Sequence, residues 1–205
     1  MSYSKTVFFL ALIMFTACVV IVACSSGDDD DDDDDAVDDD ATDDDTGDDD
    51  TSGDDDVSGD TWTDSSSGLT WSVTPSSDWM TWEEAISYCE NLSLGGHDDW
   101  RLPTISELRS LIRGCDATVT GGVCAVTDGC TDSGCWNDPC AGCAEGQGPG
   151  LDGAYWPNEM SGNIGWHWSS SAVTDDGTLA WAVNFYSGYV GSDYTDVENP
   201  AWCAR

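Results

Sequence analysis

Residues 95–111 have the sequence GGHDDWRLPTISELRSL, a polar turn followed by the start of a helix. Thr104 is followed three residues later by Glu107, and upstream Thr81 is followed at the same spacing by Glu84. Each pair is the capping box with which a helix starts. Apolar residues recur at helical spacing after each box: Trp82, Ala85, Ile86, Cys89 and Leu92 after the first, and Ile105, Leu108, Leu111 and Ile112 after the second. The stretch therefore predicts two short helices joined by a connector.

Glycines mark the expected ends of these helices. Gly95 and Gly96 follow the first apolar stripe and Gly114 follows the second. Glycine accepts the left-handed conformation that closes a helix, so the stripes are predicted to end there. Arg101 in the connector either faces a ligand or forms a structural ion pair with a neighbouring acidic residue, and the ion pair is the favoured interpretation. The acidic residues within reach are Asp98, Asp99 and Glu107.

Short strands are predicted around the helical pair. Residues 179–186 alternate most clearly, and residues 69–73 alternate like a half-buried first strand. Residues 166–169, 189–190 and 202–205 add shorter strands. Two helices followed by a small antiparallel sheet predict an α+β domain.

Residues 1–24 have the features of an export signal. Lys5 precedes an apolar run over residues 7–23, and the run ends in Ile21-Val22-Ala23-Cys24, which resembles a bacterial lipobox. The sequence predicts cleavage before Cys24, lipid attachment to its thiol, and a position in the bacterial envelope, on the outer membrane or the cell surface. An uncleaved membrane anchor and a plain secretory signal are the alternatives.

Residues 25–60 form an acidic, low-complexity segment. Twenty aspartates lie between positions 28 and 56, with no basic residue among them. Such a chain repels itself and buries no apolar area, so a disordered spacer is predicted. Weak calcium binding is the alternative, but no loop of EF-hand spacing is present.

Residues 61–205 are predicted to form one domain. From Asp60 onward the chain has 21 acidic residues and four arginines, so its net charge is −17. This charge argues against nucleic acid as a partner, because nucleic-acid binding requires a basic surface. It also argues against sulfated glycosaminoglycans, since no basic cluster offsets the repulsion.

Residues 115–143 form a cysteine-rich insert with few other apolar residues. In an exported chain this composition predicts a disulfide-stapled loop, whose internal pairing the sequence leaves open. Its six cysteines are Cys115, Cys124, Cys130, Cys135, Cys140 and Cys143. By parity, the remaining two cysteines of the domain, Cys89 and Cys203, are predicted to pair with each other. A zinc site that includes Cys140 and Cys143 is the alternative.

Three segments carry a resemblance to a known family: MTWEEAISYCENLSLGGHDDWRLPTISELRSLI at residues 80–112, WHWSSS at 166–171 and AWCAR at 201–205. Together they resemble the bacterial family DUF1566, now named the Lcl C-terminal domain after a collagen-like adhesin. The resemblance covers residues 69–205. It implies a C-type-lectin-like fold and surface or adhesive roles. The family has no agreed catalytic residues, so none is carried over.

Candidate ligand-binding residues are of two kinds. Asn137 and Asp138 follow Trp136 in a tripeptide that resembles a calcium and sugar ligand pair of C-type lectins, and their oxygens suit Ca²⁺. Trp156, Tyr186 and Tyr189 lie beside predicted turns and are the aromatic residues expected at the surface. By contrast, the strand residues Trp168 and Trp181 are expected in the core.

Catalytic signals are weak. Ser169, Ser170 and Ser171 lie close to His167, but the glycines of a nucleophile elbow are missing. The sequence therefore predicts a lipid-anchored surface module that binds a glycan or a protein, without a catalytic site and with calcium as the one candidate cofactor. A structural envelope protein is the main alternative, and an enzyme related to formylglycine-generating domains is the third.

Overall fold

The computed structural model describes residues 57–205. The predicted signal segment, the lipidation of Cys24 and almost all of the acidic spacer lie outside the described residues. Among the residues that are described, no helix has the length and apolar character needed to cross a bilayer.

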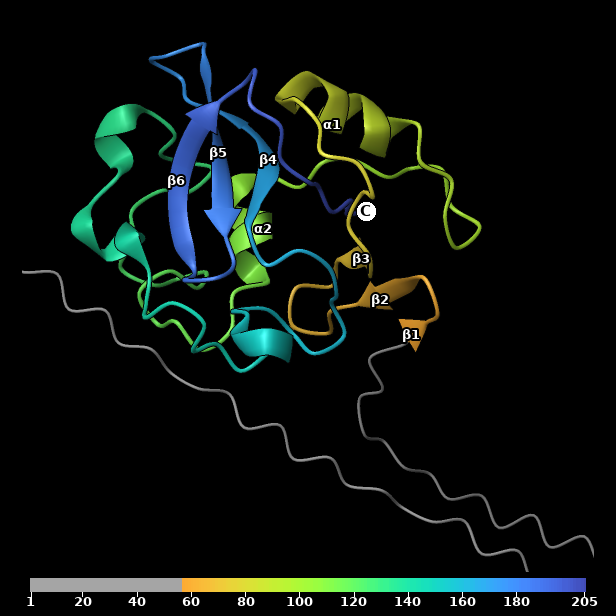
Figure 1. Ribbon diagram of the computed structural model, residues 1–205. Coiled ribbons are helices and arrows are strands. Elements are labelled where there is room, and N and C mark those ends of the chain that lie inside the picture. Colours follow the sequence, from red (N-terminus) through yellow and green to blue (C-terminus); the bar gives the residue numbers. More distant parts are fainter. Residues whose placement is uncertain (1–56) are drawn as a thin grey trace, which may run out of the picture. The chain divides into compact units, whose positions relative to one another are not determined.

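The described chain is a small α+β domain with two α-helices, three short 3-10 helices and six strands (Figure 1). The helices are α1 (Trp82–Glu90), α2 (Ile105–Ser110), η1 (Ser133–Cys135), η2 (Asp138–Ala141) and η3 (Leu151–Gly153). The strands are β1 (Val57–Ser58), β2 (Thr61–Thr63), β3 (Thr70–Ser72), β4 (Trp166–Ala172), β5 (Leu179–Asn184) and β6 (Tyr189–Tyr194). The α+β class predicted from the sequence is thus confirmed.

The strands form two antiparallel sheets instead of the single sheet that the sequence predicted. The first has the order β1-β2-β3 and the second the order β4-β5-β6. In the second sheet Val183 pairs with His167 on one side and with Val190 on the other. The register between β4 and β5 shifts between Trp168 and Ala172.

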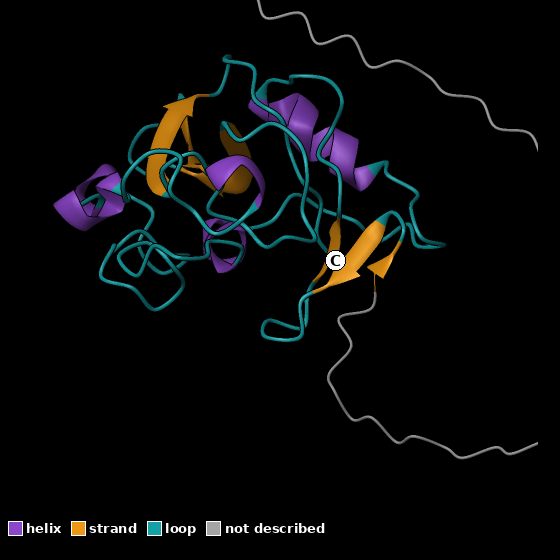
Figure 2. Cartoon of the chain, turned by 60° about the horizontal axis from the view of Figure 1, so that its bottom comes forward, coloured by secondary structure: helices purple, strands orange, loops and turns teal. Residues whose placement is uncertain are grey.

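The C-terminal segment joins the connector of the two helices to the first sheet. The backbones of Thr70 and Arg205 exchange hydrogen bonds of 3.1 and 3.0 Å. Ala204 forms the same reciprocal contact with Arg101, at 2.9 Å in both directions. Figures 1 and 2 both show the C-terminus beside β3. The predicted closing strand is therefore an added backbone partner between β3 and the connector.

Strand β5, the central strand of the second sheet, is buried on both faces. On one face Trp181 and Val183 pack in the same core cluster as the apolar side of α2. On the other face Ala180, Ala182 and Trp168 pack with the buried side of α1. Strand β5 therefore places its large side chains against α2 and its alanines on the side of α1. Both Trp168 and Trp181 are buried, as predicted.

Both capping boxes are present, but both helices end earlier than predicted. Helix α1 stops at Glu90, where the Asn91 side chain donates a hydrogen bond of 2.7 Å to the Ser87 carbonyl. Gly95 and Gly96 have positive φ angles, but they form the turn between Leu94 and His97 instead of the helix end. A polar side chain that competes for a helical carbonyl ends α1 before the glycines do.

Four disulfides cross-link the domain. Cys89 on α1 is bonded to Cys203 near the C-terminus, the pair expected from parity. The six insert cysteines form the pairs Cys115–Cys143, Cys124–Cys140 and Cys130–Cys135. Cys140 and Cys143 thus belong to different disulfides, and their sulfurs are not thiolates available to zinc.

Candidate functional site

An aromatic groove lies where the cysteine insert meets strand β6. Trp136 follows η1, and its indole N–H donates a hydrogen bond of 3.0 Å to the Val190 carbonyl on β6. This bond fixes the ring at the edge of the sheet while 37% of the residue stays exposed. An exposed tryptophan held by its polar atom presents an apolar surface of defined orientation.

Tyr189 forms the second aromatic wall. Its ring centroid lies 6.2 Å from that of Trp136, with 36° between the planes, and 5.5 Å from that of Trp166. Gly191 permits this arrangement, because an added Cβ there would lie 2.3 Å from Tyr189 Cε1 and 3.1 Å from the Trp166 ring. The glycine therefore lets the tyrosine ring lie close to the strand.

Hydroxyl groups and a buried ring complete the groove, whose volume is about 210 Å³. Ser133 and Ser192 contribute hydroxyls, and Trp181 lines it from the core. The backbone N–H and the hydroxyl of Ser133 donate to the Asp175 carboxylate at 2.7 and 2.6 Å. These hydrogen bonds lower the pKa of Asp175 and orient the Ser133 end of the groove.

The predicted aromatic surface residues have different positions. Tyr189 lines the groove. Tyr186 is exposed and contacts the region of Gly146, but it does not line the groove. Trp156 was predicted at the surface, and this prediction is wrong: the residue is 2% exposed. The Tyr155 amide bonds to the Phe185 carbonyl, and the Trp156 ring packs against Trp202 at 5.0 Å, so this turn folds onto the core.

Asn137 and Asp138 do not line the groove, although they follow Trp136 directly. The Asn137 amide oxygen accepts a hydrogen bond of 3.2 Å from the Ala125 N–H, and its amide nitrogen donates to the Val123 carbonyl at 3.0 Å. Asp138 is exposed at the start of η2. The Asn137 side chain thus holds two parts of the insert together, and Asp138 is left at the surface.

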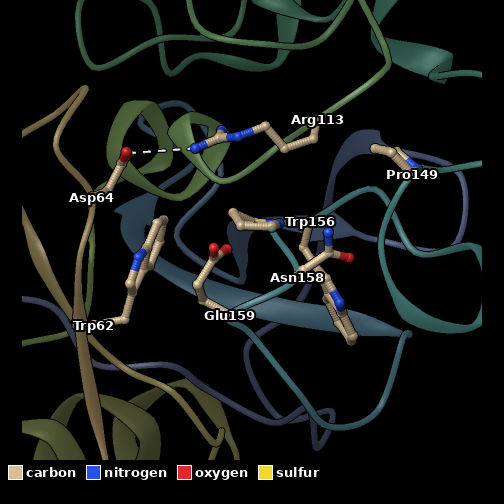
Figure 3. Close-up of a pocket in the computed structure, with 8 residues that line it drawn as sticks. Trp62, Asp64, Arg113, Pro149, Trp156, Asn158 and Glu159 are labelled. Atoms are coloured by element: carbon tan, nitrogen blue, oxygen red, sulfur yellow. Dashed lines mark ion pairs between the residues drawn. The ribbon is translucent and has the colours of Figure 1, made fainter. Parts of the chain in front are cut away.

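A second concavity, the charged pocket, has a volume of about 330 Å³. Its lining residues are Trp62, Asp64, Arg113, Pro149, Trp156, Pro157, Asn158 and Glu159. Figure 3 shows the ion pair between Asp64 and Arg113 on one side of the pocket, with the Glu159 carboxylate directed toward that side. The pocket combines one guanidinium and two carboxylates with aromatic and proline walls.

Asp64 is a buried carboxylate with many partners. It accepts hydrogen bonds from the Ser66 amide at 3.1 Å, the Ser66 hydroxyl at 2.7 Å and the Ser67 hydroxyl at 2.9 Å. Burial by itself would raise the pKa of Asp64, but these hydrogen bonds and the charge of Arg113 lower it. The carboxylate is therefore held in its ionised form.

Arg101 forms the predicted structural ion pair. Its guanidinium donates to both oxygens of Glu107, at 2.6 and 2.7 Å. Because Glu107 also belongs to the capping box of α2, the pair links the connector to that helix. The structural interpretation of Arg101 is confirmed.

The serine and histidine side chains of β4 are occupied by the core. His167 is buried and stacks on Trp202, with ring centroids 4.0 Å apart and 9° between the planes. Burial lowers the pKa of His167 to about 3. The Ser169 hydroxyl donates to the Trp181 carbonyl at 2.6 Å. In this strand, therefore, the hydroxyl and the imidazole have packing and hydrogen-bonding roles.

One group of candidate metal ligands lies within the insert. The ligand atoms of Cys130, Asp132 and Cys135 lie within 4.8 Å of one another. Both cysteines are joined in a disulfide, so neither offers a thiolate.

Sequence reasoning missed most residues of both concavities. Trp136 was noticed only as part of a tripeptide, and Ser133, Gly191 and Ser192 have no distinctive local pattern. Arg113 could have been noticed as one of only four arginines in an acidic domain. No sequence pattern around Arg113 indicates that it shares a pocket with Glu159.

The fold defines the class of protein: a small, disulfide-rich α+β domain with an exposed aromatic groove. The sequence model of the Lcl C-terminal domain matches residues 60–205. The chain therefore belongs to the Lcl C-terminal domain family. No curated protein and no solved structure matches it.

Proposed function

We propose that the chain is a cell-surface binding module that recognises a neutral glycan in the aromatic groove. The observation that carries the proposal is the exposed, hydrogen-bonded ring of Trp136 facing Tyr189. The C–H faces of a sugar ring pack on such aromatic surfaces, and the ring pair offers them without further ordering. Hydroxyls of Ser133 and Ser192 flank the rings as hydrogen-bonding groups.

The charge of the domain supports a neutral ligand. Residues 60–205 have a net charge of −17, and Asp175 lies next to Ser133 at the groove. A sulfated or carboxylated glycan would meet repulsion there, whereas a neutral one would not. A protein ligand that packs a side chain on the two rings is the other partner class.

The proposal includes the setting of the domain. A lipid on Cys24 would hold the chain on the outside of the bacterial envelope, and the acidic spacer would separate the domain from the membrane. A C-type-lectin-like fold is supported by family membership and by the Cys89–Cys203 disulfide, which links the first helix to the C-terminal segment.

A glycan array probed with the purified full-length chain tests the proposal. We expect binding to neutral glycans and not to their sulfated forms. Trp136→Ala should weaken binding at least roughly tenfold, because truncating a central aromatic contact costs about 2 kcal/mol. Repeating the array with EDTA tests whether calcium takes part.

Trp79→Ala is the matched control, because Trp79 is also exposed but does not line the groove. Binding that survives Trp136→Ala, or that is restricted to sulfated glycans, would contradict the proposal. A chain that binds no glycan but retains a protein ligand sensitive to Trp136→Ala would reassign the groove to a protein.

A further inference from the structure

The charged pocket shares no lining residue with the aromatic groove. Its volume, about 330 Å³, is at the small end of the range for ligand pockets. We propose that this pocket binds a small zwitterion, an apolar α-amino acid, whose carboxylate contacts Arg113 and whose ammonium group contacts Glu159. This site is independent of the glycan proposal.

Among the three arginines that face a carboxylate, Arg113 has the most distant partner. Arg101 lies 2.6 Å from a carboxylate oxygen of Glu107, and Arg205 lies 2.7 Å from one of Asp99. Arg109 is buried and donates to backbone carbonyls. The carboxylate partner of Arg113 is Asp64, at the longer distance of 3.6 Å. A ligand carboxylate can therefore bind Arg113 without displacing a short ion pair.

The Arg113 side chain is nonetheless held in place. Its Nη1 donates to the Ser110 carbonyl and, at 3.2 Å, to the Ile112 carbonyl. Its backbone N–H donates to the Tyr155 carbonyl at 3.0 Å. These contacts orient the guanidinium through one nitrogen and leave other N–H groups for a ligand, since arginine has five donors. The side chain remains 34% exposed.

Glu159 supplies the opposite charge. Within residues 57–205 its carboxylate has neither a hydrogen bond nor an ion pair, although the residue is half-buried. Figure 3 shows this carboxylate between Trp62 and Asn158, directed toward the Arg113 side of the pocket. A half-buried carboxylate without a partner is a suitable acceptor for a ligand ammonium group.

The charge balance selects a zwitterion over a simple ion. A ligand with a carboxylate alone would meet the carboxylates of Asp64 and Glu159 as well as Arg113, in a domain that is already acidic. A ligand with an ammonium group alone would meet the guanidinium. A zwitterion pairs with both groups at once. The walls formed by Trp62, Trp156 and the two prolines suit an apolar side chain.

Leucine and two analogues that each lack one charge test the proposal. The purified full-length chain is titrated calorimetrically with L- and D-leucine, 4-methylpentanoate and 3-methylbutylamine. We expect saturable binding of at least one leucine enantiomer. Each analogue should bind at least about tenfold more weakly, the loss expected for one charge-assisted hydrogen bond. The proposal would be overturned if neither enantiomer showed saturable binding. It would also be overturned if an analogue bound with the same affinity as leucine.

Variants connect the binding to the two charges. Arg113→Gln and Glu159→Gln should each weaken leucine binding about tenfold. In Glu159→Gln the preference for leucine over 4-methylpentanoate should also disappear, because the repulsion of the lone carboxylate is removed. A purely structural role of Glu159 would leave this preference unchanged, and that result would overturn the assignment.

Glu90→Gln is the matched control, since Glu90 is exposed at the end of α1 and lines neither concavity. It should bind leucine with unchanged affinity. Arg113→Gln removes backbone contacts as well as charge, so its thermal unfolding is recorded alongside. If Glu159→Gln unfolds normally and still binds leucine fully, the pocket assignment fails.

Discussion

The second sheet and the cysteine insert are held in shape by different means. Strand β5 is hydrogen-bonded on both sides and buried on both faces, with tryptophan, valine and alanine side chains. The insert, residues 115–143, has no β-strand or α-helix, and three disulfides connect it to itself. A segment with too little apolar surface for a core can still be ordered by cross-links.

A buried arginine adds to the cross-links of the insert. Arg109 on α2 donates through its three side-chain nitrogens to the carbonyls of Thr118, Val119 and Val126. Burial lowers its pKa, but the three acceptors compensate the buried donors. The aromatic groove lies at the boundary of the two regions, because Trp136 comes from the insert and Tyr189 from the sheet. The contacts that order the insert therefore also position one wall of the groove.

Removing the Cys89–Cys203 disulfide should have the largest effect on stability. The cross-link spans 114 positions, and replacing both cysteines by alanine should lower the free energy of unfolding by roughly 5 kcal/mol, from the lost restriction of the unfolded chain. Urea denaturation of the full-length chain measures this loss.

The Cys130–Cys135 disulfide provides the comparison within the insert. It spans five positions, so removing it should cost roughly 2 kcal/mol. If the two double variants lost the same free energy of unfolding, restriction of the unfolded chain would not be the main way in which these disulfides stabilise the fold. Trp136 lies directly after Cys135, so we also expect loss of the Cys130–Cys135 disulfide to displace the Trp136 ring more than loss of the Cys89–Cys203 disulfide does.

Arg109→Met should release the insert from the core. Three carbonyl oxygens lose their donor, and we expect a loss of roughly 3 kcal/mol in the free energy of unfolding. Hydrogen exchange should rise across residues 115–143 while strand β5 stays protected.

Arg101→Met is the control for Arg109→Met. Arg101 is an exposed partner of Glu107, so its loss should cost at most about 1 kcal/mol. An insert whose exchange does not change in Arg109→Met would show that the disulfides alone order it.

His167 makes the stability of the core dependent on pH. Its pKa in the folded chain is about 3, because burial disfavours the charged ring. The unfolded chain takes up this proton near the ordinary value of about 6.5, so stability should decrease by about 1 kcal/mol between pH 7 and pH 5.5. His167→Phe should remove this dependence, which denaturation at both pH values measures.

His97→Gln is the control for this pH dependence, since His97 is the other histidine and is exposed. It should leave the dependence intact. A decrease that persists in His167→Phe would assign the pH dependence to another group.

Local sequence signals predicted local structure well. Thr81 and Thr104 start helices where their capping boxes predicted, because a cap depends on residues three positions apart. Exposure of aromatic residues was less predictable. Trp156 and Tyr186 both lie beside turns, yet one is buried against Trp202 and the other is exposed. A turn bends the chain without determining whether the next ring faces the core.

The sequence by itself determined the α+β class, the helix starts, the acidic charge and, by parity, the pairing of Cys89 with Cys203. These properties follow from short spacings, composition and counting. Only the tertiary structure decided that Trp136 meets Tyr189, and that Asp64, Arg113 and Glu159 surround one pocket. These residues come from segments far apart in the chain, and their approach depends on how the sheets, the helices and the insert pack together.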